Sequence, residues 1–303
     1  MGLYQTYRPN TFDQIFGNED IVEALTTTLA LPDRPHAFLL HGETGCGKTT
    51  LGRIIANKIG CVGNDLREID SADFRGIDTI RDIRKKSQFA PLEGDQRVWI
   101  LDECHQISKD GQSALLKILE DTPKHITFIL CTTDPQKLIP TIKGRCSQFQ
   151  VSVLEDKQMM KLLFSIAKKE KQKVSRDVYK AIIESAEGHP RNAIQVLEQV
   201  LSVEEDKRES VAKKIKESSA QSIELSRALL NVQGWKMVSS ILKLLKDQNP
   251  ESIRRQVLGY ATAVLLNKES HQAAAMIDAF SEPTYDIGFP GIVLAAYTVV
   301  VPE

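Results

Sequence analysis

The stretch of this chain with the most specific chemistry is a glycine-rich loop near its N-terminal end. It reads Gly-Glu-Thr-Gly-Cys-Gly-Lys-Thr from Gly42 to Thr49, between an apolar run (37–40) and a helical pattern (50–58). Glycines let the backbone turn its N–H groups toward one point, and the N-terminus of the following helix adds positive potential. In this context the pattern predicts a nucleotide-binding P-loop, and a chance match is the alternative. The residues expected around the phosphates are Gly42, Glu43, Thr44, Gly45, Cys46, Gly47, Lys48, Thr49 and Thr50.

The end of this loop and a pair of carboxylates predict a site for ATP and Mg²⁺. Lys48 can reach the outer phosphates, and the Thr49 hydroxyl can hold Mg²⁺. Asp102 and Glu103 follow the apolar run 97–101, which predicts a buried strand. Asp102 suits coordination of Mg²⁺ through water, and Glu103 can polarise the attacking water as a general base. The alternative is a solvated acidic pair after a strand.

Three further polar residues stand where each could reach a terminal phosphate. Thr133 follows the apolar run 126–131 and could bond the γ-phosphate or the attacking water, although an ordinary turn explains it as well. Arg145 precedes the last expected strand, and its guanidinium could reach a phosphate of this or another P-loop. Arg191 begins a helical pattern and could couple that helix to the nucleotide. For both arginines a surface position is the alternative.

The composition narrows the class of protein. With 303 residues the chain is long enough for two or three domains, and a net charge of −1 means that any nucleic-acid contact must come from a local cluster. No stretch has the length of a membrane span and no signal peptide precedes the first helix, so we expect a cytoplasmic protein without membrane contact. Five scattered cysteines without a C-x-x-C pair predict free thiols and no zinc site.

The arrangement of hydrophobic runs predicts an α/β domain followed by helices. Strand and helix patterns alternate up to residue 153, which is typical of a parallel sheet with helices on both faces. The expected strands are 36–41, 66–70, 98–101, 127–131 and 148–153, and the expected helices between them are 18–30, 48–59, 77–89 and 111–120.

Beyond residue 153 the pattern is helical. We expect helices at 155–170, 175–187 and 191–202, then a charged stretch at 204–219 that is either a linker or a solvated helix, then helices from 220 to 301. This predicts an α/β nucleotide domain (1–153), a small helical lid (154–219) and an all-helical third domain (220–303).

Taken together, the motifs resemble the AAA+ ATPases of DNA polymerase clamp loaders, from Tyr7 to about residue 200. The segment Thr132-Thr-Asp-Pro-Gln-Lys-Leu138 is close to the bacterial gamma/tau subunit, whereas Arg75-Gly-Ile-Asp78 resembles the small subunits of replication factor C. This mixture suggests a viral or otherwise divergent loader. The resemblance implies an AAA+ P-loop domain, a lid and a collar that holds the subunits in a ring.

The resemblance also implies roles for single residues. Lys48 and Thr49 match Walker A, Asp102 and Glu103 match Walker B, Thr133 falls at sensor 1 and Arg191 at sensor 2. Arg145 matches the arginine finger that this family inserts into the ATP site of the adjacent subunit. The residues that would pack on the adenine and phosphates are Tyr7, Arg8, Pro9, Ile15, Phe16, Pro190 and Arg191.

The chain departs from the family pattern in three respects. Gly144 replaces the serine of the family's Ser-Arg-Cys motif, the zinc-binding cysteines of bacterial gamma are absent, and there is no long polymerase-binding extension.

The family contacts DNA through helix N-termini and basic residues, without reading bases. The matching residues are Arg75, Gly76, Ile77, Arg81, Arg84, Lys109, Gln112 and Ser113. Contact with the sliding clamp would come from Gln88, Phe89 and Leu92. The alternatives are a solvated basic helix face and a Phe89 that packs into its own domain.

We therefore expect an ATPase subunit of a clamp loader, in a pentameric assembly with other subunits, a ring-shaped clamp and primer–template DNA at replication forks. ATP binding would open the clamp and grip DNA, and hydrolysis would release both. One alternative is a nonhydrolysing structural subunit, although the P-loop is intact. Another is an AAA+ DNA-junction translocase, although the third domain lacks the expected β-hairpin of a winged helix.

Overall fold

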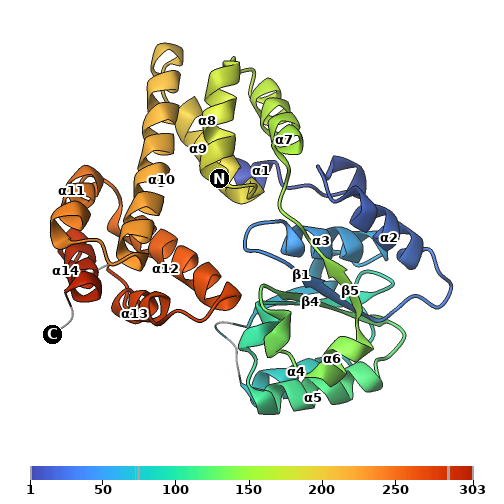
Figure 1. The fold of residues 1–303 in the computed structure, drawn as a ribbon. Helices are drawn as coiled ribbons and strands as arrows, with labels where there is room; N and C mark the ends of the chain where they lie inside the picture. The colour runs from blue at the N-terminus through green and yellow to red at the C-terminus, as the bar shows by residue number, and fades with distance from the viewer. Residues whose placement is uncertain (1, 72, 74–75, 285–286, 302–303) are drawn as a thin grey trace. The chain divides into compact units, whose positions relative to one another are not determined.

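The computed structural model describes residues 2–71, 73, 76–284 and 287–301. Within them, five parallel strands form one sheet in the order β2-β3-β4-β1-β5 (Figure 1). The strands are β1 (Ala37–His41), β2 (Leu66–Asp70), β3 (Arg97–Asp102), β4 (Ile126–Thr132) and β5 (Ser147–Gln150). Each lies within three residues of its expected position, and the prediction of a parallel α/β sheet is confirmed.

Alternate residues of the central strands fill two cores, one on each face of the sheet. Phe38 and Leu40 of β1 pack with α2 (Glu19–Leu29) and α3 (Lys48–Lys58), whereas Leu39 packs on the opposite face. That face is covered by α4 (Ile77–Lys86), α5 (Lys109–Glu120) and α6 (Pro140–Arg145), as Figure 1 shows. The sheet is therefore covered on both sides, as parallel sheets require.

The strand order brings three functional strand ends together. β1 lies beside β4, and β4 beside β3, so the loop after β1, the carboxylates after β3 and the threonines after β4 share one edge of the sheet. The Gly42 N–H donates to the Thr132 carbonyl oxygen over 3.2 Å, which ties the first of these loops to the third. Ligands of open α/β sheets bind at this edge.

Three helices outside the sheet belong to the same compact unit, which comprises residues 1–174 and 186–203. They are α1 (Leu3–Thr6), α7 (Asp156–Lys169) and α9 (Pro190–Leu201), and α9 contacts both of the others. A capping box of Glu155 and Gln158 begins α7, and Pro190 begins α9 where its missing N–H costs nothing.

Residues 175–185 and 204–303 form a second compact unit. Its helices are α8 (Arg176–Ala186), α10 (Arg208–Leu230), α11 (Trp235–Leu245), α12 (Pro250–Asn267), α13 (His271–Ala279) and α14 (Phe289–Val300). Leu225 and Leu229 of α10 pack with residues of α11 to α14 in one apolar core. The expected boundary at 219/220 falls inside α10, so the charged stretch that could have been a linker is helix; the three-domain division stays a prediction.

A partly buried ionic cluster stabilises this second unit. The Glu251 carboxylate accepts hydrogen bonds from the guanidinium groups of Arg254 and Arg255 and from the backbone N–H of Thr284. These bonds, Arg254 first, outweigh the effect of burial and lower the pKa of Glu251 to about 2. Among the described residues, no helix combines the length and the apolar composition that a transmembrane span requires.

Candidate nucleotide-binding site

The loop between β1 and α3 follows a backbone path that glycine permits. The φ angle is +151° at Gly42, +78° at Gly45 and +110° at Gly47. At Gly42 there is also no room for a side chain, because a Cβ would lie 2.0 Å from the Val151 carbonyl oxygen. Gly47 precedes the first turn of α3, whose free N–H groups make the loop an anion site.

Lys48 is the first residue of α3, and its side chain folds back over the loop. Its Nζ donates to the carbonyl oxygens of Gly42 (2.9 Å) and Glu43 (2.8 Å), and the residue is only 5% exposed. Burial and the Lys48 charge both lower the pKa of the neighbouring His41. The Lys48 side chain is therefore held at the centre of the loop by two backbone carbonyl oxygens.

Cys46, inside the same loop, is a packing residue. Its thiol is 5% exposed and donates to the Glu43 carbonyl oxygen over 2.9 Å. Burial raises the pKa of this thiol, which keeps it protonated and unreactive at neutral pH.

Thr49 and Asp102 meet across the sheet edge. The Thr49 hydroxyl donates to Asp102 Oδ2 over 2.7 Å, and Asp102 Oδ1 accepts the Glu103 backbone N–H over 3.0 Å. A hydroxyl and a carboxylate in contact offer the hard oxygen atoms that Mg²⁺ prefers. The predicted Mg²⁺ residues therefore fit that ion in position and in chemistry.

Glu103 is held at the end of β3 by residues that follow β4. It adopts a left-handed backbone conformation (φ +46°), and its Oε2 accepts the Thr133 hydroxyl over 3.2 Å. His105 Nδ1 lies 3.3 Å from the same Oε2 and 3.0 Å from the Thr132 hydroxyl. The expected general base and the expected sensor threonine are thus in direct contact.

His105 was not predicted as a site residue from the sequence. The available signal was its position two residues after Glu103, in a turn that returns the chain to the carboxylate.

Three cationic side chains from different parts of the sequence line one cavity at this edge of the sheet: Arg8, Lys48 and Arg191. Arg8 Nε donates to the Thr50 hydroxyl over 3.1 Å, and Arg191 comes from the start of α9. Burial first, and then the charges of Arg53 and Arg191, lower the pKa of Arg8, which indicates a crowded positive region. The cavity between the cations and the carboxylates is lined by Arg8, Thr44, Gly45, Gly47, Lys48, Thr49, Thr50, Asp102, Glu103 and Arg191.

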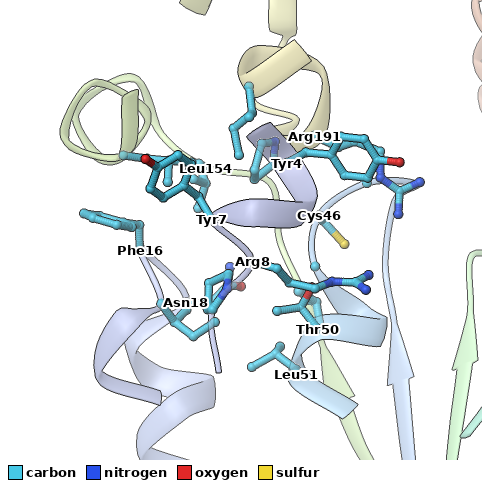
Figure 2. A pocket seen from close by; sticks show the side chains of 18 residues that line it. Tyr4, Tyr7, Arg8, Phe16, Asn18, Cys46, Thr50, Leu51, Leu154 and Arg191 are labelled. Atoms are coloured by element: carbon cyan, nitrogen blue, oxygen red, sulfur yellow. The ribbon is translucent and has the colours of Figure 1, made fainter. Parts of the chain in front are cut away.

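A more apolar hollow continues from this cavity along the phosphate loop. Figure 2 shows Tyr7 and Phe16 on one side of it and Arg8, extending toward Thr50, on the other. Tyr7, Arg8, Pro9, Ile15, Phe16, Pro190 and Arg191, all predicted from the sequence, line this hollow. Further lining residues that the sequence did not single out include Tyr4, Asn18, Leu51, Val151, Leu154, Leu162 and Ile194. The aromatic and aliphatic hollow suits the flat base of a nucleotide, and the cationic cavity beside it suits the charged phosphates.

Side-chain contacts hold the walls of the hollow. The Tyr7 hydroxyl donates to the Glu170 carboxylate, and this bond raises the pKa of Tyr7. His189 Nε2 lies 3.0 Å from Glu43 Oε2, which joins the turn before α9 to the phosphate loop. The Glu43 side chain therefore makes its contact on the outside of the phosphate loop, and it is not among the residues that line the cavity.

Arg145 does not line this cavity. It ends α6, its side chain is half exposed, and its Nη2 donates to Glu120 Oε1 over 2.8 Å. Its expected target is the site of another subunit, so the finger role stays a prediction.

The expected DNA-binding residues gather in part along a groove between α4 and α5. Gly76 precedes α4, and Lys109 begins α5 as an exposed residue. The groove is lined by Ile77, Ile80, Arg81, Arg84, Asp110, Ser113, Ala114, Lys117 and Ile118. Lys117 adds a cation that was not predicted from the sequence, and Arg75 lies outside the described residues.

Gln112, another of the expected DNA-binding residues, has a buried side chain. Its side chain is 3% exposed, its Nε2 donates to the Ile107 and Lys137 carbonyl oxygens, and its Oε1 accepts the Ile139 N–H. The structure does not support DNA contact by this side chain, because its amide is buried and holds two backbone segments together.

The expected clamp-binding residues are exposed. Phe89 is 67% and Leu92 is 71% exposed, and Gln88 is exposed beside them. Packing of Phe89 into its own domain, the alternative from the sequence, is therefore excluded.

The cysteines are free: Cys46, Cys61, Cys104 and Cys131 are buried and Cys146 is partly exposed. In the described part of the chain, no three His, Cys, Asp or Glu residues lie where they could together hold a metal ion.

Comparison with known proteins shows which families this chain resembles. Residues 63–155 match the family model described as DNA polymerase III, delta subunit. The chain is 34% identical over 225 residues to DNA polymerase III subunit gamma/tau of Mycobacterium tuberculosis, which is 67% of this chain and 39% of that protein. It is 33% identical over 221 residues to subunit tau of Escherichia coli, which is 66% of this chain and 34% of that protein. The predicted resemblance to gamma/tau subunits is confirmed, and the chain spans well under half the length of these two relatives.

Solved structures show the same fold at low sequence identity. RuvB of Thermotoga maritima, described as a Holliday junction branch migration motor, superposes with a TM-score of 0.61 at 18% identity, over 78% of this chain and 85% of that one. A mutant of the same RuvB protein superposes with a TM-score of 0.64 at 17% identity, over 95% of this chain and 91% of that one. The expected fold, a parallel α/β domain followed by helices, is thus confirmed.

Proposed function

We propose that this chain, a relative of the gamma and tau subunits of DNA polymerase III, is an ATP-hydrolysing subunit of a sliding-clamp loader. The observation that carries the proposal is the convergence of Lys48, Thr49, Asp102 and Glu103 on one cavity next to an apolar hollow. A subunit that only supports the assembly would not need this complete set.

The residues of the chain divide the work of ATP hydrolysis. Mg²⁺ and ATP, when bound, supply the divalent charge and the phosphoanhydride bond of the reaction. Lys48, Arg8 and Arg191 bind the phosphates, while Thr49 and Asp102 hold the metal. Glu103 Oε2 accepts a proton from the attacking water, and Thr133 orients that carboxylate.

The neighbouring subunit completes the site in this proposal. Arg145 leaves its bond to Glu120 and enters the ATP site of the next subunit, where its guanidinium stabilises the charge of the transition state. Hydrolysis then depends on closure of the assembly, which the resemblance gives as a pentamer.

Two surfaces of the chain take the macromolecular partners. The basic side chains Arg81, Arg84 and Lys117 of the α4–α5 groove track the phosphates of primer–template DNA. Phe89 and Leu92 dock on the clamp. The complex acts inside the cell at replication forks: ATP binding opens the clamp and grips DNA, and hydrolysis releases both.

The experiment that tests the proposal measures ATP hydrolysis by the chain assembled with its partner subunits. The clamp and primed DNA are added separately and together, and the proposal expects more than additive stimulation. Indifference to both additions contradicts a clamp loader, and tight ATP binding without turnover favours a nonhydrolysing subunit.

The RuvB-like fold favours a second candidate, a motor that moves DNA junctions. Branch migration by the purified chain in the absence of any clamp would support that candidate over the clamp loader.

A further inference from the structure

A buried ion pair lies beneath the exposed segment that carries Phe89. Asp65 is 0% exposed and Arg97 is 8% exposed, and Arg97 Nη2 lies 3.3 Å from Asp65 Oδ1. Asp65 immediately precedes β2 and Arg97 begins β3, so the pairing of these two strands places the charges together.

The Asp65 carboxylate binds the backbone of residues 87–94, which we call the Phe89 segment. Asp65 Oδ2 accepts the N–H groups of Leu92 (2.9 Å), Glu93 (2.7 Å) and Gly94 (3.0 Å), and Oδ1 also accepts that of Leu92 (2.8 Å). Three successive backbone donors thus converge on one buried carboxylate.

Arg97 binds the other half of the same segment through carbonyl oxygens. Its Nη1 donates to Phe89 (3.4 Å) and its Nη2 to Ala90 (3.0 Å), and Nη1 also donates to Lys86 (2.9 Å), the last residue of α4 before the segment. His125 Nε2 lies 3.1 Å from the Phe89 carbonyl oxygen as well. The Phe89 segment contains neither helix nor strand, so these side chains supply the backbone bonds that regular structure would otherwise provide.

The pair is charged at neutral pH. Burial alone would raise the pKa of Asp65, but the N–H groups of Glu93, Leu92 and Gly94 and the Arg97 guanidinium outweigh it and lower that pKa to about 2. Removal of one partner from a buried pair leaves an uncompensated charge, so a single substitution releases the whole segment.

The segment fixed in this way presents large apolar side chains to solvent. Phe89 and Leu92 are exposed, although the backbone that carries them is hydrogen-bonded to Asp65 and Arg97. The residues before them, Lys85 and Lys86, are exposed cations at the end of α4. A complementary partner therefore offers an apolar pocket with an acidic rim, and a preformed segment docks there at a lower entropic cost.

We propose that Asp65 and Arg97 are positioning residues that hold the Phe89 segment ready for insertion into an apolar, acid-rimmed pocket of the sliding clamp. This inference rests on the proposed function of the chain as a clamp-loader subunit. In this proposal the docking segment is kept ordered by Asp65 and Arg97, which lie outside the segment and do not touch the clamp.

The test uses the full chain with its partner subunits, the purified clamp and primed DNA. Asp65→Asn removes the buried charge at nearly constant size, Phe89→Ala removes the docking side chain, and Asp95→Asn is a matched control at an exposed carboxylate next to the segment. Hydrogen exchange of residues 87–94 reports the order of the segment, and surface plasmon resonance reports affinity for the clamp and, separately, for DNA.

For Asp65→Asn we expect at least roughly tenfold faster exchange at Leu92, Glu93 and Gly94 and roughly tenfold weaker clamp binding, with DNA affinity unchanged. The control should match the wild type. The double variant Asp65→Asn/Phe89→Ala should bind no more weakly than Phe89→Ala, because the pair acts through Phe89. Should Asp65→Asn not fold, Arg97→Lys retains a positive charge but loses the guanidinium geometry, and the same changes are expected.

The possible failures are distinguishable. If Phe89→Ala weakens clamp binding while a folded Asp65→Asn leaves exchange and affinity unchanged, the positioning role is wrong and the docking role stands. If Phe89→Ala leaves clamp binding unchanged, the docking role itself is wrong; a selective loss of DNA affinity would assign the segment to DNA and overturn the inference.

Discussion

The phosphate loop and the Phe89 segment are both irregular stretches of the α/β unit, yet they are held in opposite ways. The phosphate loop is shaped by backbone conformations that glycine permits. The Lys48 side chain folds back and donates to the carbonyl oxygens of Gly42 and Glu43 in the same loop. A buried ion pair at the start of two neighbouring strands shapes the Phe89 segment, with Asp65 just before β2 and Arg97 at the first position of β3. The conformation of the loop that surrounds a small anion is thus set by residues within that loop. The conformation of the loop that presents side chains to solvent is set by hydrogen bonds from buried residues outside it.

The difference suggests that the two loops can be impaired separately. Changes in the phosphate loop should affect nucleotide binding or turnover and leave the order of the Phe89 segment intact. Changes in the Asp65–Arg97 pair should do the reverse. Three predictions test this separation, beginning with the largest expected effect, and a fourth concerns Gly144, which lies outside both loops.

Glu103→Gln should reduce ATP turnover by roughly 10²–10⁴-fold, because the amide cannot accept the proton of the attacking water. ATP affinity should stay within about threefold, since the phosphate-binding cations remain. Single-turnover kinetics and equilibrium binding of a fluorescent ATP analogue measure the two quantities. Glu93→Gln, at an exposed residue of the Phe89 segment, is the control, and equal loss in both variants would contradict the assignment.

Lys48→Ala should weaken ATP binding by roughly 100-fold, because charge-assisted bonds to phosphate are lost. Calorimetric titration with ATP and Mg²⁺ measures this loss. Lys58→Ala, at the exposed end of the same helix, should bind normally. Hydrogen exchange of residues 87–94 should be unchanged in both variants; faster exchange in Lys48→Ala would show that the two loops are coupled.

Acid should release the Phe89 segment through Asp65. Because its folded pKa of about 2 is below the ordinary value of 3.8, this carboxylate contributes stability above about pH 4 that is lost as the pH falls toward 2. The protection of residues 87–94 against hydrogen exchange, relative to the intrinsic exchange rate at each pH, should therefore fall over that range in the wild type. In Asp65→Asn this dependence should be absent, while the acid response of the second unit, where Glu251 has a similar shift, should remain.

Gly144→Ser should have the smallest effect, a stabilisation of about 0.5 kcal/mol or less, because serine has a higher helix propensity than glycine and Gly144 lies in the last turn of α6. A Cβ at Gly144 meets no atom within 4 Å. Urea unfolding measures the change, and Gly42→Ala is the opposing control, since its Cβ would clash with the Val151 carbonyl oxygen. Destabilisation by Gly144→Ser would indicate an unrecognised contact at the end of α6.

Much of the nucleotide site could be predicted from the sequence because its determinants are contiguous. Gly42 to Thr49 form one loop, and Asp102 and Glu103 end one apolar strand, so strand order alone brings them together. Parallel strands and amphipathic helices were likewise predicted from hydrophobic period, which reflects burial on the two faces of the sheet.

The remaining features depend on tertiary contacts that no local pattern encodes. Asp65 and Arg97 are 32 residues apart and acquire their role only when β2 pairs with β3. Gln112 has the polarity of a surface residue, but tertiary packing buries its amide against two backbone segments. The first half of α10 is similarly charged and has the composition of a linker. It is nevertheless helical, and the last turns of the same helix are buried.

The two tryptophans of the chain are divided between the two compact units. Trp99 lies in β3 with 4% of its surface exposed, whereas Trp235 begins α11 and packs edge-to-face on Tyr297 at a ring distance of 5.0 Å. Each unit therefore contains its own intrinsic fluorophore in a different environment. Replacing one indole by phenylalanine would leave an emission signal from a single unit, and the melting of the sheet and of the helical unit could then be followed optically without any attached dye.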